Sequence, residues 1–258
     1  MLIFFSIILG LIIGSFLNVC IYRMPKSKSV VRPRSHCPSC EKIISWYDNI
    51  PVLSFILLGG KCRFCKAKIS IRYAVVEILT ALVFVFLIKT LGFNFTTIIY
   101  IAVSCGMIVA TFIDFDHQII PDEITIGGMI AGLILSFIYP QLHFTASRFH
   151  GLLYSMAGLL TGGSMIYLIG ILGKFLFKKD AMGGGDVKYL AMMGSFIGFK
   201  GAILIFFVAP FFGAIVGIFM KIKYKAEIIP YGPYLSIAAL LVMVWGDRIL
   251  QLLFPYLA

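Results

Sequence analysis

Residues 2–22 read LIFFSIILGLIIGSFLNVCIY, and the first charged side chain of the chain, Arg23, follows directly. An uncharged apolar run of this length is what an α-helix needs to cross a bilayer core of about 30 Å. Of the 258 residues, 60% are hydrophobic and 13% charged, against roughly 45–50% and about 25% in soluble domains. The sequence therefore predicts an integral membrane protein and excludes an ordinary cytosolic enzyme, a disordered chain and a secreted disulfide scaffold.

Further apolar runs continue this pattern along the chain. They occupy residues 74–91, 97–113, 124–139, 152–172, 187–199, 202–220 and 234–253. We therefore expect an all-α polytopic membrane protein with about eight transmembrane helices. The run at 187–199 is too short to cross a bilayer alone and follows a glycine-rich stretch, which favours a half-helix or a re-entrant segment buried in protein.

Positive charge is concentrated directly after the first span. From Arg23 to Arg72 there are eleven basic and two acidic residues, which accounts for nine of the net +11 charges. A basic segment between apolar spans is typical of a cytoplasmic loop under the positive-inside rule, so we expect the N-terminus outside and this insert inside the cell. The same charges would attract anionic lipid headgroups. A nucleic-acid surface is the less favoured interpretation, and we expect no nucleic-acid partner.

The basic insert carries two cysteine pairs. Cys37 and Cys40 form one C-x-x-C, Cys62 and Cys65 form another, and twenty-one residues separate the pairs. This spacing is typical of a tetrahedral four-thiolate zinc site, whose closed coordination makes it structural. Two disulfides are the alternative, which a reducing cytoplasm disfavours. An insert of about fifty residues builds little core, so metal binding would supply its folding free energy.

Acidic side chains are rare elsewhere and gather at predicted helix ends. Asp114 and Asp116 close the third span, and Asp186 follows three glycines in GGGD, residues 183–186. Ionisable groups near membrane depth suggest function. Two carboxylates that share a proton can hydrolyse a peptide bond, one as base toward water and one as acid toward the carbonyl oxygen. Glycines before Asp186 would let an extended substrate backbone approach.

Other interpretations of these acids remain open. Asp186 could simply be a helix-start acid stabilised by the helix dipole. An ion-coupled secondary transporter could use Asp114 and Asp186 as a relay beside a broken helix. A non-catalytic scaffold that displays the zinc-binding insert is a third possibility. The sequence contains no G-x-S-x-G, H-E-x-x-H or Walker motif that would indicate a competing chemistry.

Short motifs follow one another in a fixed order along the chain: GSFLNV (14–19), RMP (23–25), the two C-x-x-C pairs around WYDNIP (46–51) and GGK (59–61), RY (72–73) with VE (76–77), DFDHQ (114–118), GGGD (183–186) and YGPYL (231–235). This ordered set resembles the type IV prepilin peptidases, aspartic intramembrane proteases marked by G-x-G-D that also act as N-methyltransferases. The likeness covers nearly the whole chain.

The resemblance implies that Asp114 and Asp186 are the catalytic pair, with Asp116 and Asp122 as competitors for the first position. It implies prepilin or pseudopilin substrates, whose short basic leader is removed after a glycine at the inner face of the bacterial cytoplasmic membrane. It also implies methylation of the new amino terminus with S-adenosylmethionine as donor.

For the methyl donor, the resemblance points to Gly60, Lys61 and Glu77, although Glu77 could equally be a helix-start acid beside Arg72. The expected division of the chain is a first helix at 1–22, a methyltransferase-associated zinc-binding insert at 23–73 and a membrane-embedded peptidase domain at 74–258.

Overall fold

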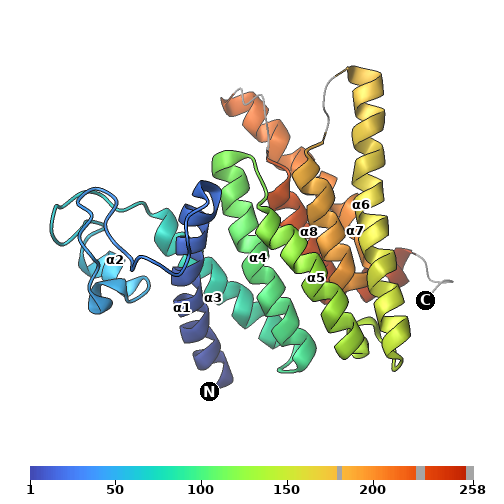
Figure 1. The fold of residues 1–258 in the computed structure, drawn as a ribbon, viewed down its shortest axis with the longest axis horizontal. Helices are drawn as coiled ribbons and strands as arrows, with labels where there is room; N and C mark the ends of the chain where they lie inside the picture. Colours follow the sequence, from blue (N-terminus) through green and yellow to red (C-terminus); the bar gives the residue numbers. More distant parts are fainter. Residues whose placement is uncertain (179–181, 225–229, 254–258) are drawn as a thin grey trace. The chain divides into compact units, whose positions relative to one another are not determined.

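The computed structural model describes residues 1–178, 182–224 and 230–253, and helices dominate these residues. Figure 1 follows the chain through them. Their bounds are α1 Leu2–Arg23, η1 Met24–Lys26, η2 Trp46–Asn49, α2 Leu53–Leu57, α3 Arg72–Leu91, α4 Phe95–His117, α5 Asp122–Ile138, η3 Pro140–His143, α6 Arg148–Phe177, α7 Gly184–Tyr224 and α8 Gly232–Leu253. The described residues contain isolated β-bridges but no named strand, so the predicted all-α class is confirmed.

The predicted apolar runs all lie in helices. Within the described residues, α1, α3, α4, α6, α7 and α8 are long and apolar enough to cross a membrane. Helix α5, with 17 residues, covers a further predicted run. The two runs at 187–199 and 202–220 are joined in α7, where Gly198 interrupts the helix with φ 77° and ψ 178°. The short run is therefore the first part of a kinked helix, because a glycine can adopt this backbone conformation without a connecting loop.

The chain forms two compact units, of which the first is Met1–Val109. In this unit α1 packs against α3. The two backbones come very close, because a Cβ atom at Gly10 would lie 2.5 Å from Cα of Ala81. Near the end of α1, the amide of Asn18 donates a 3.0 Å hydrogen bond to the carbonyl of Tyr73 in α3. The basic insert, with η1, η2 and α2, connects these two helices (Figure 1).

The second unit is Ala110–Ala258, in which α7 packs against α5, α6 and α8. Helices α6 and α7 meet at glycines: a Cβ atom at Gly158 would lie 2.0 Å from the carbonyl oxygen of Gly194. Just before the Gly198 kink, the Ser195 carbonyl accepts hydrogen bonds from Ser155 of α6 at 2.7 Å and Ser136 of α5 at 3.4 Å. A break in a helix leaves carbonyls without intrahelical partners, and these hydroxyls supply replacements in the protein interior.

Candidate active site and metal centre

Asp114 lies one turn before the end of α4 and is 5% exposed. Its Oδ2 atom accepts a 2.9 Å hydrogen bond from the backbone N–H of Gly232, the first residue of α8. A Cβ atom at position 232 would lie 2.8 Å from the same oxygen, so the contact requires glycine. The start of α8 therefore holds one carboxylate oxygen of Asp114 in place.

Asp186 is the third residue of α7 and lies in the same unit. Its carboxylate accepts a 3.2 Å hydrogen bond from the N–H of Gly183. Its neighbour Gly185 packs on Ile120, because a Cβ atom there would lie 3.3 Å from Cβ of Ile120. Gly232, the partner of Asp114, also packs on Ile120. The structure thus brings the segments of both aspartates around one buried isoleucine.

Hydroxyl groups from α4, α7 and α8 meet at Ser236, one turn into α8 from the Gly232 that binds Asp114. Ser236 accepts a 2.9 Å hydrogen bond from Thr111 and donates one of 2.9 Å to the carbonyl of Gly232. The Tyr189 hydroxyl lies 2.7 Å from the Ser236 hydroxyl. Tyr231 precedes α8, and burial together with the nearby Asp186 charge raises the pKa of its phenol to about 12. The Tyr231 phenol is therefore uncharged at neutral pH.

The two competing aspartates have different surroundings. Asp116 is exposed at the end of α4. Asp122, the first residue of α5, is also exposed and forms an ion pair with Lys188 of α7. Lys188 stands two residues after Asp186, so this ion pair ties the start of α5 to the segment that carries the second aspartate. Among these four acids, Asp114 is the one that the structure buries.

The four cysteines of the insert converge on one point. The Sγ atoms of Cys37, Cys40, Cys62 and Cys65 all lie within 4.8 Å of one another, and those of Cys37 and Cys65 are 3.8 Å apart. Tetrahedral coordination with bonds of about 2.3 Å places sulfurs about 3.8 Å apart, so the cluster fits a four-coordinate metal ion. Hydrogen bonds from the backbone of Cys65 and Phe64 lower the pKa of Cys62, whereas hydrogen bonds with the other three thiols raise that of Cys40, so the metal-free thiols share their protons and a bound metal would displace them.

The two cysteine pairs have the same backbone hydrogen bonds. At the first pair, the N–H of Cys37 donates to the carbonyl of Lys42, and the carbonyl of Cys37 accepts from Glu41. At the second, Cys62 is bonded in the same way to Ala67 and Lys66, five and four residues further on. Glu41 and Lys66 both have left-handed backbone, with φ of 56° and 59°. Each pair is thus a knuckle of the same shape, despite different intervening side chains.

An ion pair joins the segment between the knuckles to the second knuckle. Arg63 donates to Asp48 of η2 through Nε at 2.7 Å and through a terminal nitrogen at 2.6 Å. The hydrogen bond and charge of Arg63 lower the pKa of Asp48. The Arg63 guanidinium also lies over the ring of Tyr47, 5.5 Å from its centre. The WYDN segment is therefore fixed to the residue that follows Cys62.

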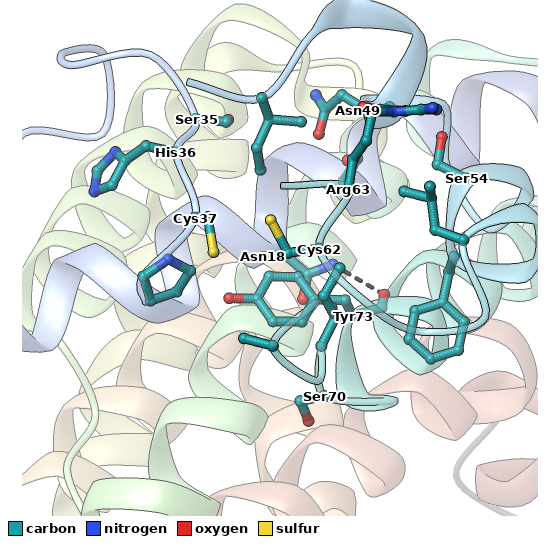
Figure 2. A pocket seen from close by; sticks show the side chains of 18 of the residues that line it. Asn18, Ser35, His36, Cys37, Asn49, Ser54, Cys62, Arg63, Ser70 and Tyr73 are labelled. Carbon is teal, nitrogen blue, oxygen red and sulfur yellow. Dashed lines mark hydrogen bonds and ion pairs between the residues drawn. The ribbon is translucent and has the colours of Figure 1, made fainter. Parts of the chain in front are cut away.

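A cavity of about 470 Å³ lies in the first unit, bounded by the knuckles and by residues of α1 and α3 (Figure 2). Glu77 of α3 lines it and is 7% exposed, and its Oε2 accepts a 2.7 Å hydrogen bond from the N–H of Val52. Gly60 and Lys61 are not among the lining residues. Gly60 is bonded through its backbone to Phe55 and Ile69, both of which do line the cavity.

Several contacts of this site had no individual signal in the sequence. The motif YGPYL contains Tyr231 and Gly232, but only the fold shows that they lie beside Asp186 and Asp114 respectively. Likewise, the sequence did not indicate that Asp48 forms an ion pair with Arg63. The WYDNIP motif was the available clue to Asp48, and nothing in the sequence indicated that the backbone of Val52 would hold Glu77.

The chain is similar in sequence to two family models and to several known proteins. The profile of the Bacterial Peptidase A24 N-terminal domain matches residues 8–91, and that of the Type IV leader peptidase family matches residues 101–218. The chain is 34% identical to the prepilin leader peptidase/N-methyltransferase of Pseudomonas aeruginosa, over 95% of this chain and 90% of that protein. It is 33% identical to the Aeromonas hydrophila protein of the same name, over 95% and 92%.

A relative of that name from Myxococcus xanthus is 38% identical over 84% of this chain, and the match spans 62% of the relative's length. No solved structure matches the chain. The chain belongs to the type IV prepilin leader peptidase family. These relatives carry peptidase names and give no support to the transporter interpretation.

Proposed function

We propose that this protein is an aspartic endopeptidase that removes the leader of type IV prepilins or pseudopilins at the cytoplasmic membrane face and then N-methylates the new first residue. The proposal rests on one observation: the segments that carry Asp186 and bind Asp114 both pack on Ile120. In this arrangement the Gly232 N–H donates a hydrogen bond to Asp114. The names of the relatives supply the substrate class and the second activity.

In the proposed reaction, Asp114 and Asp186 share one proton. Two like charges close together do not both ionise easily, so one carboxylate is the base toward water and the other protonates the scissile carbonyl oxygen. The Gly232 N–H fixes the orientation of Asp114. Gly184, beside Asp186, is exposed with no other group within 4 Å of where its Cβ would be, which leaves space for an extended substrate backbone.

The proposed metal is zinc, held by Cys37, Cys40, Cys62 and Cys65. Four thiolates close the coordination sphere, so the ion stabilises the insert and takes no part in the chemistry. The proposed methyl donor is S-adenosylmethionine, which supplies a methyl group bonded to a positively charged sulfur. We assign the cavity of the insert to it, with Glu77 in direct contact and with Gly60 and Lys61 acting through the wall formed by Phe55 and Ile69.

The proposed location is the bacterial inner membrane, with several spans, the N-terminus outside and the basic insert in the cytoplasm. Methyl transfer would then belong to the insert at 23–73 together with Glu77 near the start of α3, and peptide cleavage to the segment 74–258 that carries Asp114 and Asp186. The partners are the substrate and membrane lipid, with no role for nucleic acid.

The test uses the detergent-purified full chain and one purified prepilin, with mass measurement of the product's N-terminus. Asp114→Asn and Asp186→Asn should each abolish leader removal, while Asp116→Asn, the control two residues away, should retain substantial activity. Loss of activity in Asp116→Asn alone would show that the first aspartate is wrongly assigned. Prepilin left intact by the unaltered protein, together with ion flux in liposomes, would favour the transporter instead.

A further inference from the structure

Glu77 is a buried carboxylate that the peptidase reaction does not use. Two carboxylates line the cavity of the first unit, Asp48 and Glu77. Arg63 already binds Asp48 through two nitrogens. Glu77 instead accepts the N–H of Val52 and lies beside Ser15, both of which are neutral groups. Its negative charge is therefore the one in this cavity that is available to a cationic group of a ligand.

The local structure holds Glu77 in this position. Val52 presents its N–H from an unusual backbone conformation, with φ 61° and ψ −47°. On the other side, a Cβ atom at Gly14 of α1 would lie 2.7 Å from Cα of Glu77, so α1 and α3 are in close contact there. A side chain fixed by a hydrogen bond at one oxygen and by a neighbouring helix is preorganised, and it loses little entropy when a ligand binds.

The depth of Glu77 matches the proposed substrate. Glu77 is the sixth residue of α3, which places it about 7.5 Å along the helix from Arg72 at a rise of about 1.5 Å per residue. In the proposed function, on which this inference rests, cleavage leaves an amino group on the first residue of an apolar helix. That amino group cannot move far from the membrane surface, because the apolar helix stays in the lipid.

We infer that Glu77 binds the α-ammonium of the cleaved substrate and accepts its proton, which makes Glu77 a catalytic residue of methyl transfer. An ammonium has no lone pair, so it cannot attack a methyl group until one proton leaves. After Glu77 takes that proton, the nitrogen lone pair forms the N–C bond. The C–S bond of the donor then breaks with its electron pair on sulfur, and the product is a secondary ammonium.

The charges around the cavity make a carboxylate necessary for this binding. The cations that line it are Arg23, Lys42, Arg63, Lys68 and Arg72. The other titratable groups there are Tyr22, His36, Cys37, Asp48, Cys62 and Tyr73. A wall with this excess of positive charge repels an ammonium unless a negative group offsets the repulsion. Glu77 provides that group inside the cavity, because Arg63 already pairs with Asp48, and the negative charge that four thiolates would keep around one divalent ion is centred at the knuckles.

The first experiment measures binding without any methyl donor. A short synthetic peptide that begins with phenylalanine is titrated into the purified metal-loaded protein, once with a free amino terminus and once acetylated. The unaltered protein should bind the free amine about tenfold more tightly, the difference expected for a charge-assisted hydrogen bond. Glu77→Gln, which keeps an oxygen for the Val52 N–H, should lose this preference and bind the free amine no more tightly than the acetylated peptide. Unchanged discrimination in Glu77→Gln would overturn the inference.

A second measurement follows methylation of the same peptide, so that peptide cleavage is not required. Glu77→Gln should lose most methylation at neutral pH and recover it as the pH rises past about 8, where the amine loses its proton unaided. Glu77→Asp, which retains a carboxylate, should keep part of the activity at neutral pH. Glu123→Gln, an exposed acid of α5, is the control.

The outcomes separate the inference from the function on which it rests. If the unaltered protein fails to methylate the peptide, the proposed methyltransferase function is wrong. If the unaltered protein methylates and Glu77→Gln does so equally at every pH, only the role of Glu77 is wrong. Leader cleavage and bound metal in Glu77→Gln should equal those of the unaltered protein, and their joint loss would assign Glu77 a structural role and overturn the inference.

Discussion

The backbone N–H of Gly232 donates a 2.9 Å hydrogen bond to Oδ2 of Asp114, 118 residues earlier in the chain. This contact joins the start of α8 to the end of α4, and it leaves 2.8 Å between the carboxylate oxygen and the position that a Cβ atom of residue 232 would occupy. Gly232, which is remote in sequence, therefore supplies the hydrogen-bond donor of Asp114 and, because it has no side chain, leaves room for the Asp114 carboxylate.

We predict that Gly232→Ala reduces leader cleavage at least tenfold, because the added methyl displaces the Asp114 carboxylate, and a misplacement of about 1 Å can cost about 100-fold in rate. The measurement is the initial rate of prepilin cleavage by the purified variant. Gly127→Ala is the matched control, since a Cβ atom at this helical glycine meets nothing within 4 Å. Equal rates for the two variants would show that the Gly232 contact does not position the catalytic group.

We predict that Cys37→Ser and Cys62→Ser cause equal loss of bound zinc, because the two knuckles have the same backbone hydrogen bonds and contribute equivalent ligands. The zinc content of the purified variants, measured by metal analysis, should fall from about one ion per chain toward none. Proteolysis within residues 24–71 should accelerate, since metal binding supplies folding free energy to so small a segment.

Cys105→Ser, in α4 and outside the cluster, is the control for the cysteine variants and should keep its zinc. A protein purified without zinc and with Cys37 and Cys40 oxidised would contradict the assignment of the cluster as a metal centre.

We predict that Asp48→Asn raises the rate of backbone amide hydrogen exchange in the insert several-fold at neutral pH, because the variant loses the ion pair in which Arg63 binds Asp48 through two nitrogens. Arg63 lowers the pKa of Asp48, so the contribution of this pair is present above the carboxyl's ordinary pKa and is lost as the pH falls through the lowered value. Exchange in the WYDN segment should thus differ between variant and unaltered protein at pH 7. A difference of the same size in acid, below that pKa, would argue against the ion pair.

We predict that Ser155→Ala destabilises the protein by about 0.5–1.5 kcal/mol, because the variant removes a buried 2.7 Å hydrogen bond to the Ser195 carbonyl beside the Gly198 kink. Unfolding in mixed micelles measures the change. Ser164→Ala is the control: Ser164 is also in α6, but its hydroxyl is exposed and bonds to its own helix at the Thr161 carbonyl. A smaller loss for Ser155→Ala than for Ser164→Ala would contradict this account of the kink.

The sequence predicted the features that depend on local pattern. Residues 2–22 lie in α1, which has one further residue, because an uncharged and mostly apolar run followed by Arg23 defines a span on its own. The spacing of Cys37, Cys40, Cys62 and Cys65 predicted their convergence, because a C-x-x-C pair has few ways to direct two sulfurs toward one point. The family resemblance likewise depended on motifs that are contiguous in the chain.

Contacts between distant segments could not be predicted in this way. Gly198 begins the stretch GFKG (198–201), where the sequence separates two apolar runs, yet α7 continues through it, because Ser155 and Ser136 bind the Ser195 carbonyl before the break. Glu77 could be read as a helix-start acid, and only the position of Val52 shows that its carboxylate is held in a cavity. Such contacts depend on which side chains meet in space, which a single sequence does not state.

The matching knuckles have an implication for how this insert can vary. The bonds that shape each knuckle run between main-chain atoms, and the intervening residues are Pro38 and Ser39 in one half and Arg63 and Phe64 in the other. A knuckle specified by its backbone does not need particular side chains there to hold its shape, but all four of these residues line the cavity of the first unit, and Arg63 also pairs with Asp48. Substitutions between the paired cysteines would therefore change what the cavity accommodates while the four thiols keep their positions.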